Sequence, residues 1–229
     1  MSRRLSAIDT VRRTAADDIF ERLRAEIVSM RLTPGTKLSE ADIARRFEVS
    51  RQPVREAFIR LSNSNLVAIR PQRATVVRRI SKTEVLETRF IRTALEVELV
   101  RLACDRGIRG REAGFEASLA MQRSAVEARD TDRFNALDYD FHRLICEAAG
   151  RAFAFRRIAE NKVYVDRLCM LSLADKAGLD EILEDHETIY ARLRGGDSAG
   201  AIAAMRLHLT RLDATVAEAQ AAYPDYFED

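Results

Sequence analysis

The sequence predicts a mainly α-helical protein with a basic N-terminal domain at residues 12–80 and a larger helical domain at residues 83–222. Four prolines and nine glycines among 229 residues are few for an all-β fold. Apolar residues recur at helical spacing through most of the chain. Residues 1–80 carry 17 Lys and Arg against 9 Asp and Glu, a net charge of +8, whereas residues 81–229 carry a net −6. This asymmetry indicates a domain that binds a polyanion, joined to a domain with another task.

Three helices are expected in the N-terminal domain. Ile19, Leu23 and Ile27 recur at helical spacing within residues 15–31, and Pro34-Gly35 predicts a turn after that helix. Ser39-Glu-Ala-Asp42 is typical of the capped start of a second helix. The third helix is expected at residues 50–61 with Ser50 as its cap, because Pro53 then falls in the first turn, where its missing N–H costs little.

The outer face of the third helix carries Arg51, Gln52 and Arg55 near its N-terminus. Arginine can bond the O6 and N7 atoms of guanine in a fork, and glutamine can pair with adenine. A helix N-terminus also favours phosphate. Residues 66–77 are expected to form two short strands around a turn, so three helices and a basic two-stranded wing predict a winged helix-turn-helix. The alternative is a small helical domain whose surface arginines are only solvated. It would account for any one arginine, but not for the helices, the wing and the basic residues together.

Residues 17–81 resemble the DNA-binding domain of the GntR family of bacterial transcription regulators. The resemblance is carried by Pro34-Gly35-Thr-Lys-Leu-Ser-Glu40 and above all by Val49-Ser-Arg-Gln-Pro-Val-Arg-Glu-Ala57. It implies contacts between the third helix and double-stranded operator DNA, with the wing tip in the minor groove. The residues implied to bind DNA are Arg45, Ser50, Arg51, Gln52, Arg55 and Arg73.

Two positions depart from that family pattern. Glu48 stands between the second and third helices where the family usually has glycine, so a glutamate is expected to accept an unfavourable backbone angle. The wing tip, Pro71-Gln72-Arg73-Ala74, lacks the usual glycines. The expected minor-groove contact therefore depends on the guanidinium of Arg73.

Residues 83–222 are expected to form an antiparallel all-helical bundle of about six helices with short turns. The predicted helices cover residues 84–105, 111–129, 131–149, 152–174, 179–193 and 198–222, with Thr131 and Ser198 as caps. Cys104, Cys146 and Cys169 lie far apart among apolar neighbours, which is typical of reduced core thiols in a cytoplasmic protein. No segment approaches the roughly 18 apolar residues that a membrane span needs, so no membrane partner is expected.

Acidic and imidazole side chains accompany the apolar faces of these helices. Asp138 and His142 lie one turn apart beside the apolar stripe of residues 134–145. His186 and His208 flank the Gly195-Gly196 turn, and a helical hairpin would bring them to within about 5 Å in height. A lone histidine on such a face is usually a satisfied core residue. Three histidines and a carboxylate together favour a divalent cation, because burying them unsatisfied is costly.

The same region resembles the FCD ligand-binding domain of FadR-type GntR regulators, over about residues 83–215. Asp138-x-x-Phe141-His142, Asp185-His186-Glu-x-Ile189 and Ala204-Met-Arg-x-His208-Leu carry the resemblance. It implies a metal bound by one Asp and three His, namely Asp138, His142, His186 and His208. Such borderline ligands suit Zn first, with Ni, Mn or Fe as alternatives. The resemblance also implies that Arg92 binds an effector, although a salt bridge with Glu96 is an equal explanation for Arg92.

The sequence therefore predicts a transcription regulator, with repressor as the expected mode, rather than an enzyme. A homodimer is expected, because dimeric readers of this kind bind near-palindromic operators. A small organic-acid effector at the metal is expected to change operator affinity. The four protein ligands could instead close a structural site, or the ion itself could be the signal. A metallohydrolase is the remaining alternative, but no residue stands out as its general base.

Overall fold

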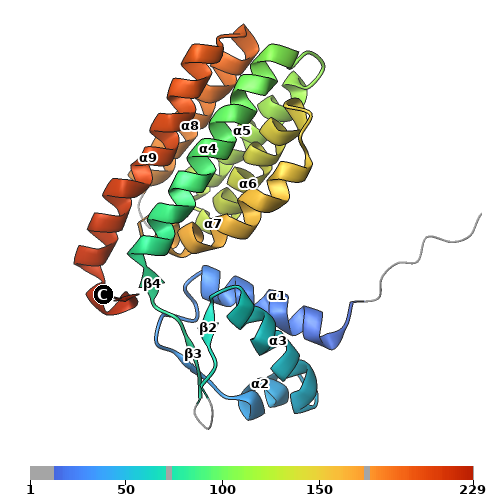
Figure 1. Cartoon of the computed structure of the whole chain (residues 1–229), viewed down its shortest axis with the longest axis vertical. Helices are drawn as coiled ribbons and strands as arrows, with labels where there is room; N and C mark the ends of the chain where they lie inside the picture. Colours follow the sequence, from blue (N-terminus) through green and yellow to red (C-terminus); the bar gives the residue numbers. More distant parts are fainter. Residues whose placement is uncertain (1–12, 71–73, 173–175, 229) are drawn as a thin grey trace, which may run out of the picture. The chain divides into compact units, whose positions relative to one another are not determined.

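The computed structural model describes residues 13–70, 74–172 and 176–228, which form two compact units (Figure 1). The N-terminal unit extends to Arg78, except that Val28–Pro34 group with the C-terminal unit that starts at Arg79. The chain is mostly helical, as predicted, with a small sheet in the N-terminal unit. Within the described ranges, none of the helices has an apolar stretch that could span a lipid bilayer. Each unit has its own core, so the two are described separately.

The N-terminal unit has the predicted helices and wing. Its helices are α1 (Ala15–Val28), α2 (Glu40–Arg46) and α3 (Arg51–Asn63), and its strands are β1 (Lys37–Leu38), β2 (Val67–Ala68) and β3 (Thr75–Val77). The antiparallel sheet has the order β1-β3-β2, so β2 and β3 form the expected hairpin. Strand β1 was not predicted, because two residues are too few for an alternating pattern. Ile19, Leu23 and Phe58 are among the buried residues of this core.

The turn between α2 and α3 has the backbone strain expected at Glu48. This residue adopts a φ of 56°, a left-handed conformation that costs about 1–2 kcal/mol for a residue with a Cβ atom. Ser39 caps α2 by accepting a hydrogen bond from the Asp42 amide. Ser50 occupies the cap position of α3, but its side chain makes no capping hydrogen bond. The turn therefore depends on the packing of α2 against α3, because it has neither a glycine at position 48 nor a side-chain hydrogen bond from Ser50.

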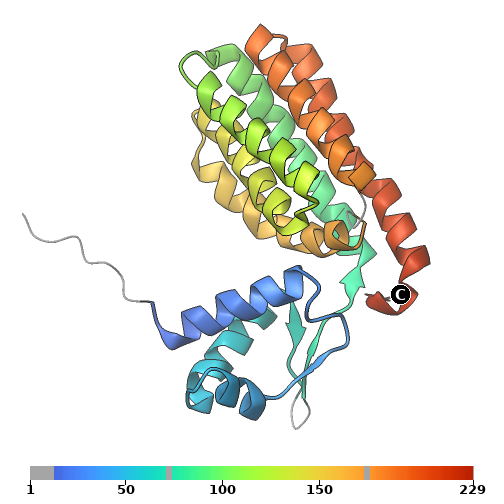
Figure 2. The same ribbon diagram turned by 180° about the vertical axis from the view of Figure 1, so that it is seen from behind.

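The C-terminal unit is a bundle of long helices that run alongside one another (Figures 1 and 2). They are α4 (Lys82–Arg106), α5 (Glu112–Ala128), α6 (Thr131–Ala148), α7 (Phe153–Ser172), α8 (Lys176–Gly195) and α9 (Ser198–Ala222). The predicted caps Thr131 and Ser198 were wrong by one residue. Asp130 and Asp197 cap α6 and α9 instead, accepting hydrogen bonds from the amides of Arg133 and Gly200. A carboxylate at this position also suits the positive end of the helix dipole.

A second, smaller core closes the end of the bundle where the chain enters it. Strand β4 (Ile80–Ser81) pairs in parallel with β5 (Phe227–Glu228), which follows a 3₁₀ turn at Pro224–Tyr226. The side chains of Ile80 and Phe227 are buried with those of Val85, Val165 and Leu212. The sequence did not predict this pairing. It secures the segment that leads from the wing into α4.

We expect Phe227→Ala to lower the free energy of unfolding by about 3 kcal/mol, because it removes a fully buried aromatic side chain and leaves a cavity. The measurement is urea unfolding of the whole chain, followed by circular dichroism. Tyr223→Ala is the matched control, since the Tyr223 side chain is 42% exposed. Equal losses in the two variants would contradict a specific role for this small core.

Candidate metal centre

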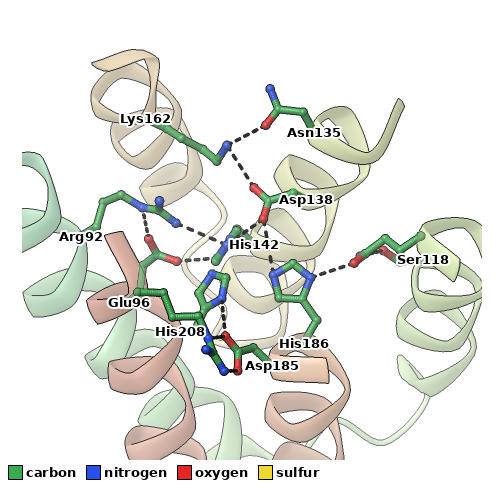
Figure 3. A network of polar contacts seen from close by, with 12 residues as sticks. Arg92, Glu96, Ser118, Asn135, Asp138, His142, Lys162, Asp185, His186 and His208 are labelled. Atoms are coloured by element: carbon green, nitrogen blue, oxygen red, sulfur yellow. Dashed lines mark hydrogen bonds and ion pairs between the residues drawn. The ribbon is translucent and has the colours of Figure 1, made fainter. Parts of the chain in front are cut away.

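Four ligand-type side chains meet inside the helical unit. Helix α6 supplies Asp138 and His142, α8 supplies His186, and α9 supplies His208 (Figure 3). All four are buried, and one ligand atom from each lies within 4.8 Å of the others. In zinc sites such ligand atoms lie about 2.0–2.2 Å from the ion, so four atoms at this spacing are close enough together to be candidates for one shared ion. The structure thus brings together residues that are up to 70 positions apart in the sequence.

A carboxylate or amide oxygen lies near the Nδ1 atom of each imidazole, and the contact between His186 and Gln122 has the geometry of a hydrogen bond. The Nδ1 atom of His142 lies 2.5 Å from Glu96, that of His186 lies 2.8 Å from the Gln122 amide oxygen, and that of His208 lies 3.5 Å from Asp185. Metal-bound histidines almost always have such a partner on the second nitrogen, because it fixes the tautomer and the ring orientation. The Nε2 atoms of His142 and His186 both face Oδ1 of Asp138.

His186 supplies the most direct sign that the cluster fits a cation. Its Nε2 atom is buried and has no hydrogen-bond partner among the described residues. The nearest acid is Asp138, whose Oδ1 atom lies 3.4 Å from this nitrogen and 3.8 Å from Nε2 of His142. The ring of His186 also stacks on Phe141 at 4.2 Å between centroids, which holds it in place. A nitrogen buried without a partner is costly, and a metal ion would satisfy it.

The protonation states also suit a cation. Burial lowers the pKa of His186 well below its usual value, so the imidazole is neutral at pH 7, as a metal ligand must be. Burial alone would raise the pKa of Asp138, but the positive charge of the nearby Lys162 ammonium outweighs this effect. The pKa of Asp138 is therefore below its usual range. The carboxylate is therefore ionised. One carboxylate and three imidazoles are a suitable donor set for Zn²⁺ and other divalent transition ions.

Arg92 forms the salt bridge with Glu96 and also lies beside the cluster, while its expected role in effector binding stays a prediction. Its Nε atom donates to Glu96 at 2.6 Å, which is the expected salt bridge between residues one turn apart. Its Nη2 atom also lies 3.3 Å from Nε2 of His142, on the side where the four ligands meet. The Arg92 side chain is only 3% exposed, so both interactions occur away from bulk water. Arg92 thus joins Glu96 to the rim of the cluster.

A pocket of about 290 Å³ adjoins the cluster. Its size suits a small organic molecule, and both apolar and charged groups line it. The apolar walls come from Phe134, Val165, Ile182 and Leu212, and the basic groups are Arg92, Lys162 and Arg211. Asp138 and His208 also line it, so the pocket opens directly onto two of the four ligand-type residues.

Several site residues were not identified from the sequence. Gln122 on α5 and Lys162 on α7 are buried polar residues in contact with the cluster. Lys162 and Asp166 have the i,i+4 spacing of an ordinary exposed ion pair, so their spacing gave no sign of burial. Cys146 is buried, Cys104 and Cys169 are partly buried, and all three are free thiols outside the four-residue cluster.

Five of the six residues expected to contact DNA are described, and all five are exposed. Arg45 lies at the end of α2, Ser50 precedes α3, and Arg51, Gln52 and Arg55 lie in the first turns of α3. Some side chains pair with neighbouring acids: Arg55 bonds Glu40 at 2.8 Å, and Gln52 donates to Glu56 at 3.1 Å. These are surface pairs, which contribute little to stability and are readily exchanged for phosphate or base contacts. The predicted contact Arg73 lies outside the described residues.

Comparisons with known proteins match both units. Residues 15–77 match the model described as bacterial regulatory proteins, gntR family, and residues 87–211 match the FCD domain. The HTH-type transcriptional repressor RspR of Escherichia coli (strain K12) is 36% identical over 211 residues, which cover 92% of each chain.

A second relative and a solved structure agree with these matches. The probable D-xylose utilization operon transcriptional repressor of Paenarthrobacter nicotinovorans is 31% identical over 199 residues, 86% of this chain and 87% of its own. A putative GntR transcriptional regulator from Rhodococcus sp. RHA1 superposes with a TM-score of 0.73 at 24% identity, covering 91% of this chain and 98% of its own. At that identity, the structural likeness shows the fold alone.

We expect Zn²⁺ to stabilise the protein through the four clustered residues. At a free concentration of 100 times the Kd, an ion that binds only the folded state adds about 2.7 kcal/mol to the free energy of unfolding. His186→Ala should abolish this gain and the bound metal. Chemical unfolding with and without Zn²⁺, together with elemental analysis, measures both.

The matched control for this prediction is Ile189→Ala, which removes a fully buried side chain from the same helix without touching the cluster. This variant should lose stability but keep the Zn²⁺-dependent gain. A His186→Ala protein that retained one Zn²⁺ per chain would rule out the cluster as the binding site.

Proposed function

This chain belongs to the GntR family of bacterial regulatory proteins, with an FCD domain as its C-terminal part, and from that membership we propose that a small carboxylate at a metal centre controls its affinity for operator DNA. The family and the matched relatives are transcription regulators, so the chain is a DNA-binding regulator rather than a metallohydrolase. A repressor is the proposed mode, since two relatives bear that name. We assign DNA binding to residues 12–80 and effector binding to residues 83–222.

The observation that carries the effector proposal is the position of Arg92 beside the clustered ligands. Its guanidinium lies 3.3 Å from the inward nitrogen of His142 and lines the same pocket as Asp138 and His208. Asp138, His142, His186 and His208 would hold the ion, which when bound supplies a positive charge and a coordination position for a carboxylate oxygen. Arg92 would donate charge-assisted hydrogen bonds to the same carboxylate. A pocket of about 290 Å³ limits this ligand to a small organic acid.

The same geometry is compatible with a metal sensor, in which the ion is the only signal. Four protein donors can complete a tetrahedral site without any further ligand. Arg92 favours the carboxylate over this alternative, because its Nη2 atom is directed to the cluster while its Nε atom bonds Glu96. The two functions differ in whether operator affinity responds to an acid at constant metal.

We expect a thermal-shift screen of small organic acids against Zn²⁺-loaded protein to identify stabilising acids that also change operator affinity. The coupling should be about 1–3 kcal/mol, or roughly 5- to 150-fold in affinity. Arg92→Lys should keep the metal but bind the acid more weakly, because lysine lacks the two-pronged guanidinium. An operator affinity that changes with metal and with no acid would instead establish the metal sensor.

We expect Arg51→Ala and Arg55→Ala each to weaken operator binding by about 1–3 kcal/mol, since both arginines lie in the first turns of α3, to which we assign the DNA contacts. The measurement is a fluorescence anisotropy titration with operator DNA at fixed salt. The matched control is Arg101→Ala, which removes an exposed arginine of α4 that pairs with Glu98. Equal losses for Arg101 and Arg51 would indicate a general charge effect and not a recognition helix.

We propose a homodimer through an exposed apolar face formed by α4 and α9. Phe90 on α4 is 73% exposed and Leu207 on α9 is 55% exposed. A groove of about 300 Å³ beside them is lined by Phe90, Ala94 and Val97 together with Arg206. Apolar side chains that gather into one exposed patch are typical of a surface that a partner covers. A second copy would also supply the second DNA-binding domain that a near-palindromic operator requires.

We therefore expect Phe90→Asp to convert the dimer to a monomer, because a charge would be buried in the interface. Sedimentation velocity at micromolar concentration measures the change. Phe153→Asp is the control, since Phe153 is equally exposed, at 73%, but lies on α7. A Phe90→Asp protein that sediments like wild type would exclude this face.

A further inference from the structure

Lys162 is a buried lysine that hydrogen-bonds Asn135 and Asp166 and forms an ion pair with Asp138. Its Nζ atom lies 3.1 Å from Oδ1 of Asn135 and 3.1 Å from Oδ2 of Asp138 (Figure 3). It also lies 2.6 Å from Oδ1 of Asp166. The ammonium also lies 4.2 Å from the ring centre of Tyr139, whose hydroxyl donates to Asp166. The side chain is only 4% exposed. Helices α6 and α7 therefore hold this cation in one position.

The position of Lys162 makes the two oxygens of Asp138 unequal. Oδ2 lies against the ammonium, whereas Oδ1 faces Nε2 of His186 at 3.4 Å and Nε2 of His142 at 3.8 Å. A carboxylate can bind a metal through one oxygen or through both. With Oδ2 held by an ammonium, only Oδ1 is directed to the point that the imidazoles share.

A direct role for Lys162 as an anchor for the effector is less consistent with these contacts. Two of the three donors of the ammonium bond Asn135 and Asp166, and its charge is paired with Asp138. A ligand would have to displace Asn135 or a buried carboxylate to reach it. Lys162 lines the pocket, but its effect on a bound anion passes through Asp138.

We propose that Lys162 is a positioning residue that holds Asp138 to one-oxygen coordination and thereby keeps a position on the ion open for an exogenous anion. This inference rests on the proposed metal centre. Without the ammonium, Oδ2 is free to rotate toward the ion and occupy that position itself. Lys162 also places a fixed positive charge beside the pocket, which partly offsets the carboxylates of Asp138 and Asp166.

The test uses Co²⁺ alone as the metal and acetate as the simplest carboxylate probe, because the visible absorption of Co²⁺ reports its coordination number. In wild-type protein we expect one Co²⁺ per chain and an absorption change when acetate binds. Lys162→Met should still bind one Co²⁺, with a spectrum of altered intensity before acetate is added. Its acetate affinity should fall at least tenfold.

Tyr139→Phe is the matched control, because it removes the hydroxyl contact to Asp166 and leaves the aromatic ring and the Lys162–Asp138 pair in place. This variant should bind acetate as wild type does. If Lys162→Met does not fold, Lys162→Gln, which keeps donors but no charge, takes its place. Thermal unfolding of each Co²⁺-loaded protein confirms that the compared proteins are folded.

Three results would overturn the proposal. Lys162→Met could bind acetate with wild-type affinity, it could fail to retain Co²⁺, or Tyr139→Phe could lose as much acetate affinity as Lys162→Met does. Failure of the proposed metal centre is a separate result, because wild-type protein itself would then bind no Co²⁺. That outcome would remove the role of Lys162 together with the site.

Discussion

The structure depends on how a buried carboxylate and three buried imidazoles are satisfied. Placed together in an apolar bundle without partners, they would cost more free energy than the surrounding packing can easily supply. Neighbouring polar groups offset part of this cost. Oxygen atoms of Glu96, Gln122 and Asp185 lie near the Nδ1 atoms of the three imidazoles, and Lys162 pairs with one oxygen of Asp138. What remains is a set of inward-facing donor atoms. The proposed cation would satisfy them and link α6, α8 and α9.

This arrangement also joins stability to recognition. The outer partners are themselves charged or buried: Arg92 bonds Glu96, and Arg211 bonds Asp185 at 2.6 Å. Both arginines line the pocket beside the cluster, so the groups that orient the imidazoles are connected to the groups that a visiting acid would meet. A ligand that binds either arginine would weaken the bond between that arginine and Glu96 or Asp185, and so change the contact of that carboxylate with a histidine of the cluster. Effector binding and metal binding are therefore expected to be thermodynamically linked.

The sequence predicted the fold and the four clustered residues because their signals are local or symmetric. Asp138 and His142 share one helix face, and the Gly195-Gly196 turn places His186 and His208 at matching heights. Lys162 was not predicted as a site residue, because its burial depends on which helices surround it. Its spacing to Asp166 is also that of an ordinary surface ion pair. The β4–β5 pairing involves two-residue strands far apart in the chain, which leave no periodic pattern. The cap positions were misplaced by one residue because serine, threonine and aspartate all suit them.

The pairing of β4 with β5 has a consequence for how the protein is made. Phe227 lies 147 positions after Ile80, yet both belong to the small core that secures the entry to α4. The ribosome therefore completes the N-terminal unit long before the partner of the connecting segment is synthesised. A chain that stopped short of β5 would retain the groups proposed to read operator DNA, but its connecting strand would have no β5 to pair with. Premature termination late in the gene would therefore yield a chain whose DNA-binding unit is joined to the helical unit by a segment without its β-strand partner.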